Sequence, residues 1–178
     1  MTTPATPAPD DKDWTWVLER PCPECGFDAA SIDRADFGAR ARTSVAALQS
    51  AVLASGSTER PAPDVWSAVE YGAHVRDVCI IFGARLNLMR GVHNPDFANW
   101  DQDETALAEQ YWTQDPQTVS AELASEGERI ASDFDSVGDD EWERPGRRSN
   151  GSVFTVDTLG RYFLHDLHHH VHDVTTPN

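Results

Sequence analysis

The feature that most constrains this chain is a dense row of histidines close to its C-terminus. Five of the seven histidines lie in the eight residues from His165 to His172. The row continues a pattern of apolar residues three and four positions apart, which predicts a helix over about 155–174. The apolar positions of this pattern are Tyr162, Phe163, Leu164, Leu167, Val171 and Val174. The chain must therefore fold so that one helix presents several imidazoles along a single side.

Helical spacing makes the row a candidate metal site. Positions three and four apart share a helix face, so His165, His168, His169 and His172 would line one side. Spacing alone leaves two ligand pairs open, His165 with His169 and His168 with His172. Either pair could converge on one ion at about 2.0–2.1 Å, but a stable site needs a further ligand. Asp166, turned about 100° from His165, fits a surface acid as well as a group that orients a ligand. The alternative interpretation is a solvated polar face near a chain end.

His74 is the candidate for the further ligand. It lies in the middle of a second predicted helix, capped by Asp64 and nearly apolar all round in its central turns, which we expect to be buried. A buried histidine needs a partner for its ring nitrogens, and a metal ion would supply one. The alternative is a core histidine satisfied by Glu70 or by a carbonyl group. Asp77, one turn from His74, is placed for proton transfer or for orienting a ligand.

The N-terminal sequence Cys22-Pro-Glu-Cys25-Gly26 has the shape of a metal-binding turn, because such a turn points both thiolates the same way. A closed zinc site needs four ligands, and the sequence shows no second cysteine pair. The two cysteines could be half of a site completed by histidine or by another subunit, or a redox pair. We favour a tight turn with two partly buried thiols, outside the main site.

The helical pattern predicts an all-α fold, a four-helix bundle with helices over about 31–54, 64–90, 116–137 and 155–174. Asp115 and Pro116 form a cap and first-turn proline for the third helix, and Thr155 or Asp157 caps the fourth. A short acidic and aromatic helix over about 104–112 suits a lid, and 138–151 is predicted to be a long loop. Residues 1–12 alternate proline with small polar residues, so we expect a disordered tail. Residues 13–178 are then one domain, beginning with a short extended arm.

The order of these motifs resembles the DinB/YfiT-like superfamily of helical-bundle metalloenzymes. The resemblance is carried by His74-Val-Arg-Asp77 in the second helix and by the terminal pair His165 and His169. The N-terminal Trp-Val-Leu and Cys-Pro-x-Cys-Gly sequences are similar to those of actinobacterial members. The resemblance covers nearly the whole chain and implies a bundle of DinB/YfiT type. It also selects His165 and His169, together with His74, as the metal ligands.

Three neutral imidazoles would leave the charge of the ion uncompensated and one coordination position open, which is typical of a catalytic metal. Zn²⁺ is the first choice, and Ni²⁺, Fe²⁺ and Mn²⁺ also suit histidine. Similarity to mycothiol and bacillithiol S-transferases and to maleylpyruvate isomerase implies a thiol S-transferase or isomerase acting on small electrophiles. The cofactor would be a low-molecular-weight thiol such as mycothiol. Arg147 and Arg148 are candidates to bind a carboxylate of the thiol or substrate, and Asp77 is the candidate catalytic residue.

Two other functions stay open at this point. One is a metal-dependent hydrolase of a small molecule, with Asp77 or a spare histidine moving protons. The other is a non-catalytic metal-binding or interaction module, which closed coordination of the ion would favour.

The charge balance narrows the partners. The formal net charge is −16 with a pI of about 4.6, so the surface repels nucleic acid and anionic lipid. Three cysteines are an odd number and do not indicate a disulfide framework. The sequence contains neither a leader pattern nor an apolar run of about 18 residues, so we expect a cytoplasmic protein with a small-molecule substrate. A homodimer through the bundle faces is left open.

Overall fold

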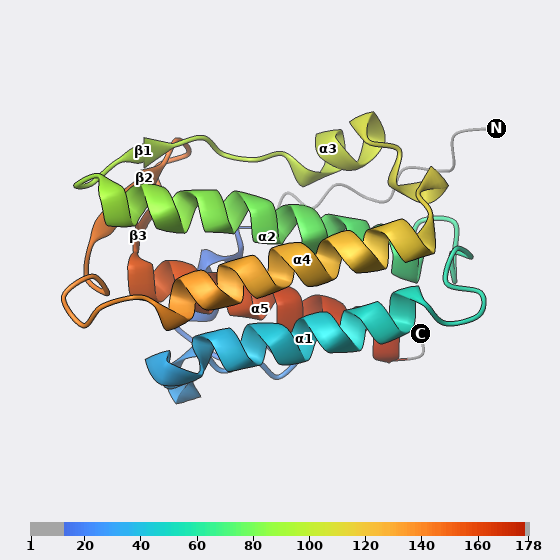
Figure 1. The fold of residues 1–178 in the computed structure, drawn as a ribbon, viewed down its shortest axis with the longest axis horizontal. Coiled ribbons are helices and arrows are strands. Elements are labelled where there is room, and N and C mark those ends of the chain that lie inside the picture. The colour runs from blue at the N-terminus through green and yellow to red at the C-terminus, as the bar shows by residue number, and fades with distance from the viewer. Residues whose placement is uncertain (1–12, 177–178) are drawn as a thin grey trace.

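A computed structural model describes residues 13–176, and the tail predicted over 1–12 lies outside the described residues. Four long helices form the body of the molecule: α1 (Phe37–Val52), α2 (Ala68–Gly91), α4 (Pro116–Asp135) and α5 (Val156–Thr175). α1 and α2 each pack against both α4 and α5, so the helices enclose a common core (Figure 1). This arrangement confirms the predicted four-helix bundle.

The helices begin where local sequence supplies caps. Ser67 and Glu70 form a capping box at the start of α2, three residues later than the predicted cap. Asp115 caps α4 ahead of Pro116, and Thr155 caps α5, as the sequence predicts. The start of α5 sets where the histidines of this helix lie along the bundle.

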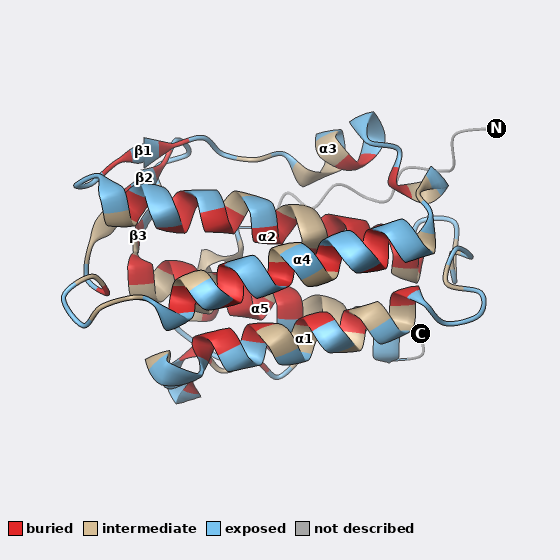
Figure 2. Cartoon of the chain, in the orientation of Figure 1, coloured by how far each residue is buried: buried red, intermediate tan, exposed pale blue. Residues whose placement is uncertain are grey.

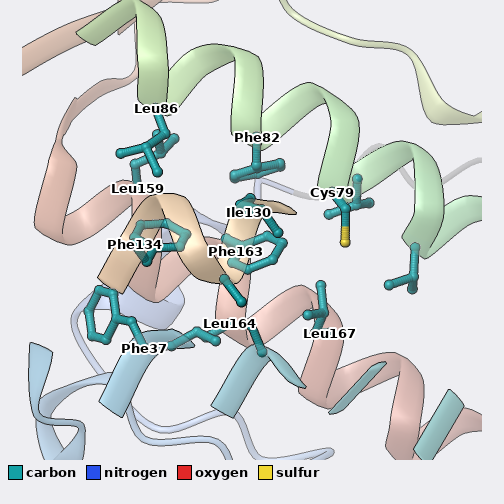
Figure 3. Packing of buried hydrophobic residues seen from close by; sticks show 14 of the residues in the cluster. Phe37, Cys79, Phe82, Leu86, Ile130, Phe134, Leu159, Phe163, Leu164 and Leu167 are labelled. Atoms are coloured by element: carbon teal, nitrogen blue, oxygen red, sulfur yellow. The ribbon is translucent and has the colours of Figure 1, made fainter. Parts of the chain in front are cut away.

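Aromatic side chains fill the centre of the bundle. Buried residues occupy the facing sides of the helices, and exposed residues the outer sides (Figure 2). Phe134 of α4 lies 5.7 Å from both Phe37 of α1 and Phe163 of α5, measured between ring centroids (Figure 3). Gly160 allows this packing, because a Cβ atom there would lie 2.5 Å from the Phe37 ring. α5 is therefore held close to α1 by the lack of a side chain at this position.

α2 is the buried helix that the sequence predicts. Its central turns are buried on several sides, including the fully buried His74 and the largely buried Arg85. A long helix that is buried on several sides could also be a membrane-spanning helix. Among residues 13–176, however, no helix is both long and apolar enough to cross a membrane.

A small three-stranded sheet closes one end of the bundle, where the sequence predicts only loop (Figure 1). Its strands are β1 (Asp96–Phe97), β2 (Pro145–Arg148) and β3 (Val153–Thr155), in the order β1-β2-β3. β1 pairs with β2 in parallel, and β2 pairs with β3 antiparallel. A turn at Asn150 joins β2 to β3, and Gly151 follows it with a φ of 99°.

Short 3₁₀ turns and one short helix complete the chain. They are η1 (Trp14–Leu18), η2 (Ala29–Ser31), η3 (Arg34–Asp36), α3 (Gln102–Ala108) and η4 (Tyr111–Thr113). The N-terminal arm is thus a 3₁₀ helix and not the extended segment expected, because the Asp13 side chain accepts the Thr15 N–H and closes a turn. It packs against α5. α3 lies along α2 in the position of the expected lid (Figure 1).

Candidate metal centres

The structure sorts the metal-ligand candidates into two groups, both of which use α5. The first group contains His74, Asp166 and His170, and the second contains Cys22, Cys25, His165 and His169. Within each group, one ligand atom per residue lies within 4.8 Å of the others. The three histidines selected by resemblance are therefore divided, with His74 in the first group and His165 and His169 in the second.

The division follows from helix geometry. α5 carries two pairs at a spacing of four residues, and the pairs are offset by one position. Each pair shares a face, and one position turns the helix by about 100°. The pair formed by Asp166 and His170 faces α2, whereas the pair formed by His165 and His169 faces the N-terminal segment.

The first group has the spacing of ligands around one ion. Asp166 Oδ1 lies 3.6 Å from His74 Nε2 and 3.7 Å from His170 Nε2. These distances are too long for hydrogen bonds. Ligand atoms bound tetrahedrally at about 2.1 Å would lie roughly 3.4 Å apart, close to what is seen.

Burial supports the same conclusion. His74 is fully buried and neither of its ring nitrogens has a hydrogen-bond partner, and Asp166 Oδ1 is likewise buried and unbonded. Glu70 does not satisfy the histidine, because its carboxylate accepts the Ser67 N–H and pairs with Arg60 at 2.9 Å. Buried polar atoms without partners are costly, so these residues fit a bound cation.

Neighbouring groups hold the first group in place. The ring of Trp100 stacks on His74 at 5.6 Å, and Trp66 packs on the same ring at 5.4 Å. His170 Nδ1 donates to Asp173 Oδ2 at 2.8 Å, which orients the ring with Nε2 toward Asp166. Burial would raise the pKa of Asp166, but the imidazoles of His74 and His170 hold it below its usual value. Asp166 is therefore ionised, which is the form that would bind a cation.

A cavity of about 370 Å³ lies one layer of side chains away from the first group, whose three residues do not line it. Its lining includes Trp66, Tyr71 and Asp173. Each of these residues contacts the group, since Trp66 packs on His74 while Tyr71 and Asp173 contact His170. These three side chains therefore separate the cavity from the ligands.

The predicted catalytic residue Asp77 is engaged in a separate network. Its carboxylate pairs with Arg76 at 2.8 Å and accepts a hydrogen bond from the Tyr111 hydroxyl. Burial first, and then Asp77, raise the pKa of Tyr111 above its usual value. Tyr111 packs on Trp66, so Asp77 reaches the first group through these two rings.

The two predicted arginines differ in their surroundings. Arg147 is exposed and pairs with Asp96 at 2.7 Å across the sheet. Arg148 is largely buried over the rings of Phe154 and Tyr162. Neither belongs to a ligand group.

Arg85 is a residue that sequence reasoning missed. Burial, and then the charge of Arg148, lower the pKa of Arg85 to about 10. Within residues 13–176 neither Arg85 nor Arg148 has a carboxylate in ion-pair contact. The sequence signal that could have identified Arg85 is its position as an arginine within the most apolar of the predicted helices.

The second group is compact and shielded. Cys22 Sγ lies 3.8 Å from His169 Nδ1, and all three thiols of the chain are free. Burial lowers the pKa of His165 to about 4 and also lowers that of His169, which keeps both rings in the neutral form that binds metals. The cysteine turn and the histidine row, which are far apart in sequence, thus meet in the fold.

Comparisons with known proteins agree with this architecture. The chain is similar to the solved structure of YfiT from Bacillus subtilis, described as a probable metal-dependent hydrolase with an unusual four-helix bundle topology. The TM-score is 0.69 at 20% sequence identity, over 80% of this chain and 86% of YfiT. No curated protein matches the sequence. Residues 38–174 match the sequence model of the DinB superfamily, and the chain therefore belongs to the DinB superfamily.

Proposed function

We propose that this protein is a divalent-metal-dependent enzyme for small molecules, with its catalytic ion held by His74, Asp166 and His170. The observation that carries the proposal is that Asp166 Oδ1 lies 3.6 Å from His74 Nε2 and 3.7 Å from His170 Nε2. Both His74 nitrogens and Asp166 Oδ1 are also buried without a hydrogen-bond partner. The nearest cavity, of about 370 Å³, lies beyond Trp66, Tyr71 and Asp173, so a substrate in it would reach the ion past these side chains. This ligand set replaces the one that resemblance implied for the catalytic ion.

Three protein ligands leave a coordination position for a fourth. A divalent ion at such a site would lower the pKa of a water molecule or a thiol bound there. Asp173 fixes the tautomer of His170, while Trp66 and Trp100 exclude water from the His74 ring. Two imidazoles and a carboxylate suit Zn²⁺ first, and Fe²⁺, Mn²⁺ and Ni²⁺ remain alternatives.

We infer that the nucleophile is the thiolate of a low-molecular-weight thiol, so that the protein acts as an S-transferase or isomerase on small electrophiles. Support comes from the motif resemblance and from the buried pair Arg85 and Arg148, which has no carboxylate partner of its own among the described residues. The pair could bind an anionic group of the thiol or substrate. Arg148 lies over Tyr162, one turn of α5 before Asp166, so the anionic group would be at the far end of an extended molecule.

Metal-dependent hydrolysis is the second candidate, and one observation favours it. YfiT, which shares the fold, is described as a probable metal-dependent hydrolase. In that case a water molecule, in place of the thiol, would bind the ion held by the same three ligands.

The test is metal content and turnover of untagged protein, wild type beside His74→Ala and His170→Ala. An S-transferase should convert chlorodinitrobenzene only when metal and a thiol are both present. A hydrolase should cleave activated esters with metal alone. Both variants should lose one equivalent of metal and all of the metal-dependent turnover.

His93→Ala is the matched control, because His93 is exposed and belongs to neither ligand group. It should keep the metal content and the turnover of the wild type. Unchanged metal content in both His74→Ala and His170→Ala would refute the ligand assignment. Full metal content without either turnover would favour a non-catalytic metal-binding module.

A further inference from the structure

The second ligand group carries an inference of its own. We propose that Cys22, Cys25, His165 and His169 bind a second ion, a structural Zn²⁺ that ties the N-terminal segment to α5. This site is separate from the catalytic group and does not depend on the reaction assigned there.

The first argument is convergence. Two residues near the N-terminus and two residues on the last helix bring one ligand atom each to within 4.8 Å of one another. Two thiolates and two imidazoles are a common donor set of structural zinc sites. The four donors match the number that closed tetrahedral coordination requires, with no position left for substrate.

The second argument is the shape of the cysteine turn. Gly26 N–H donates to Cys22 O at 2.9 Å, and Cys22 N–H donates to Phe27 O at 2.8 Å. Gly26 has a φ of 75°, a conformation that glycine adopts without strain. The backbone therefore closes on itself, and His168 of α5 contacts the turn through Nε2, 3.2 Å from Cys25 O.

The third argument is unmet hydrogen bonding. His165 is 4% exposed, and its buried Nε2 has no hydrogen-bond partner. The alternative interpretation, a tight turn with two partly buried thiols, gives no reason for a buried imidazole to stay unsatisfied beside them. A metal ion does, because the ring nitrogen would be a ligand.

The fourth argument is the layer around the ligands. His169 Nε2 lies 3.5 Å from Glu24 Oε2 and 3.9 Å from Asp173 Oδ1, so carboxylates face the nitrogen opposite the one near Cys22. Carboxylates in this position commonly orient metal-bound histidines. The rings of Trp14 and Phe27 pack on His165 at 5.5 and 5.4 Å. Such cover suits a closed site.

Binding of Zn²⁺ to these four residues requires no reactant other than the ion. Each thiol gives one proton to solvent as its sulfur binds the ion, and the two thiolate charges neutralise Zn²⁺. The imidazoles are already neutral, so they bind without releasing protons.

The site also has a consequence for the first group. α5 supplies ligands to both groups, and Asp173 reaches His170 of one and His169 of the other. An ion in the second group would therefore fix the rotation of α5 about its axis and hold Asp166 toward His74.

Cobalt substitution tests the proposal on the full-length protein. We expect two equivalents of Co²⁺ per chain, with a thiolate-to-cobalt charge-transfer band and the intense d–d absorption of tetrahedral cobalt. Cys22→Ser and Cys25→Ser should lose that band and bind one equivalent less. His74→Ala should keep the band while losing the other equivalent, which separates this site from the catalytic one.

Cys79→Ala is the matched control, because Cys79 is a buried thiol outside both groups. It should keep the charge-transfer band. A wild-type protein that binds cobalt without this band would overturn the proposal, even if the cysteine variants fail to fold. A Cys22–Cys25 disulfide in protein purified under reducing conditions would overturn it as well.

Discussion

Asp166 shows how the surroundings of one residue decide its role. In sequence it is an acid beside a histidine, as suited to the surface as to a site. In the fold its Oδ1 is buried and lies 3.6 Å from His74 Nε2 and 3.7 Å from His170 Nε2. An anion in this position compensates part of the charge of a divalent ion, which two imidazoles alone cannot do.

Replacing Asp166 tests this role. Asp166→Asn keeps the size of the side chain but removes its charge, so we expect metal affinity of the first group to fall by at least about 100-fold. Asp166→His should restore binding, because it recreates a histidine pair at a spacing of four residues. Isothermal titration with Zn²⁺ in the Cys22→Ser background, where only the first group binds, measures both. Equal affinity of the asparagine variant and its parent would contradict the assignment.

Asp173 offers a second test at the same scale. Its carboxylate accepts from His170 Nδ1 at 2.8 Å, and Asp173→Asn would weaken the orientation of that ring. Loss of such an outer partner costs about 10- to 100-fold in metal affinity or activity. We expect this loss in a competition assay with a chromogenic chelator. Asp139→Asn, on an exposed loop, should leave the affinity unchanged.

The sequence indicates which residues are candidate metal ligands more readily than it indicates which of them lie together. The spacing of the terminal helix predicts metal-binding pairs, and the apolar run around His74 predicts its burial. Whether the pair Asp166 and His170 or the pair His165 and His169 faces α2 depends on the rotation of α5 about its axis. One position along a helix changes the direction of the side chain by about 100°. That rotation is set by contacts such as Gly160 against Phe37, which no local pattern reveals.

Among the elements, α5 supplies residues to both candidate ligand groups, and ion pairs anchor its first turn. Asp157 pairs with Arg34 at 2.7 Å and with Arg161 at 2.9 Å. Burial would raise the pKa of Asp157, but these two guanidinium groups bring it below its usual value. The anchor joins η3 to the start of α5 and so helps to set the helix that holds both ligand groups.

The ion pairs of Asp157 predict a pH dependence of stability. Because its folded pKa is depressed, the carboxylate stabilises the fold above its unfolded pKa, and this stability is lost as pH falls through the folded pKa. We expect Asp157→Asn to lower the free energy of unfolding by about 2 kcal/mol at neutral pH. Urea unfolding across the acid range should show the difference from wild type shrinking as pH falls. A difference that is constant with pH would contradict this account.

The elements that sequence analysis missed are the short ones. The four long helices carry apolar residues over many turns, and their existence follows from that period. The three strands are two to four residues long, and β2 reads Pro-Gly-Arg-Arg, which has no alternation of apolar and polar residues. Their pairing depends on Asp96 and Arg147 being brought together by the ends of the bundle, which is a tertiary effect.

At the scale of the whole molecule, three separate parts of the chain meet at the ligand groups. α2 supplies His74, α5 supplies ligands to both groups, and the N-terminal segment supplies Cys22 and Cys25. The segment over 13–27 lies outside the four long helices and packs on α5. It is attached by apolar side chains such as Val17 and Phe27, which are buried, and the proposed zinc site would add a second attachment.

Metal removal should accordingly loosen one part of the molecule and leave the rest intact. We expect hydrogen exchange of the metal-free protein to accelerate over residues 13–27 and the last turns of α5, since these lose their common ion. Peptides from α1 and α4 should keep their protection, because the aromatic core around Phe134 holds them. Metal-loaded Cys22→Ser should show the same pattern as the metal-free wild type, whereas metal-loaded His74→Ala should protect residues 13–27 normally. Uniform loss of protection across all four helices would mean instead that the ions stabilise the bundle as a whole.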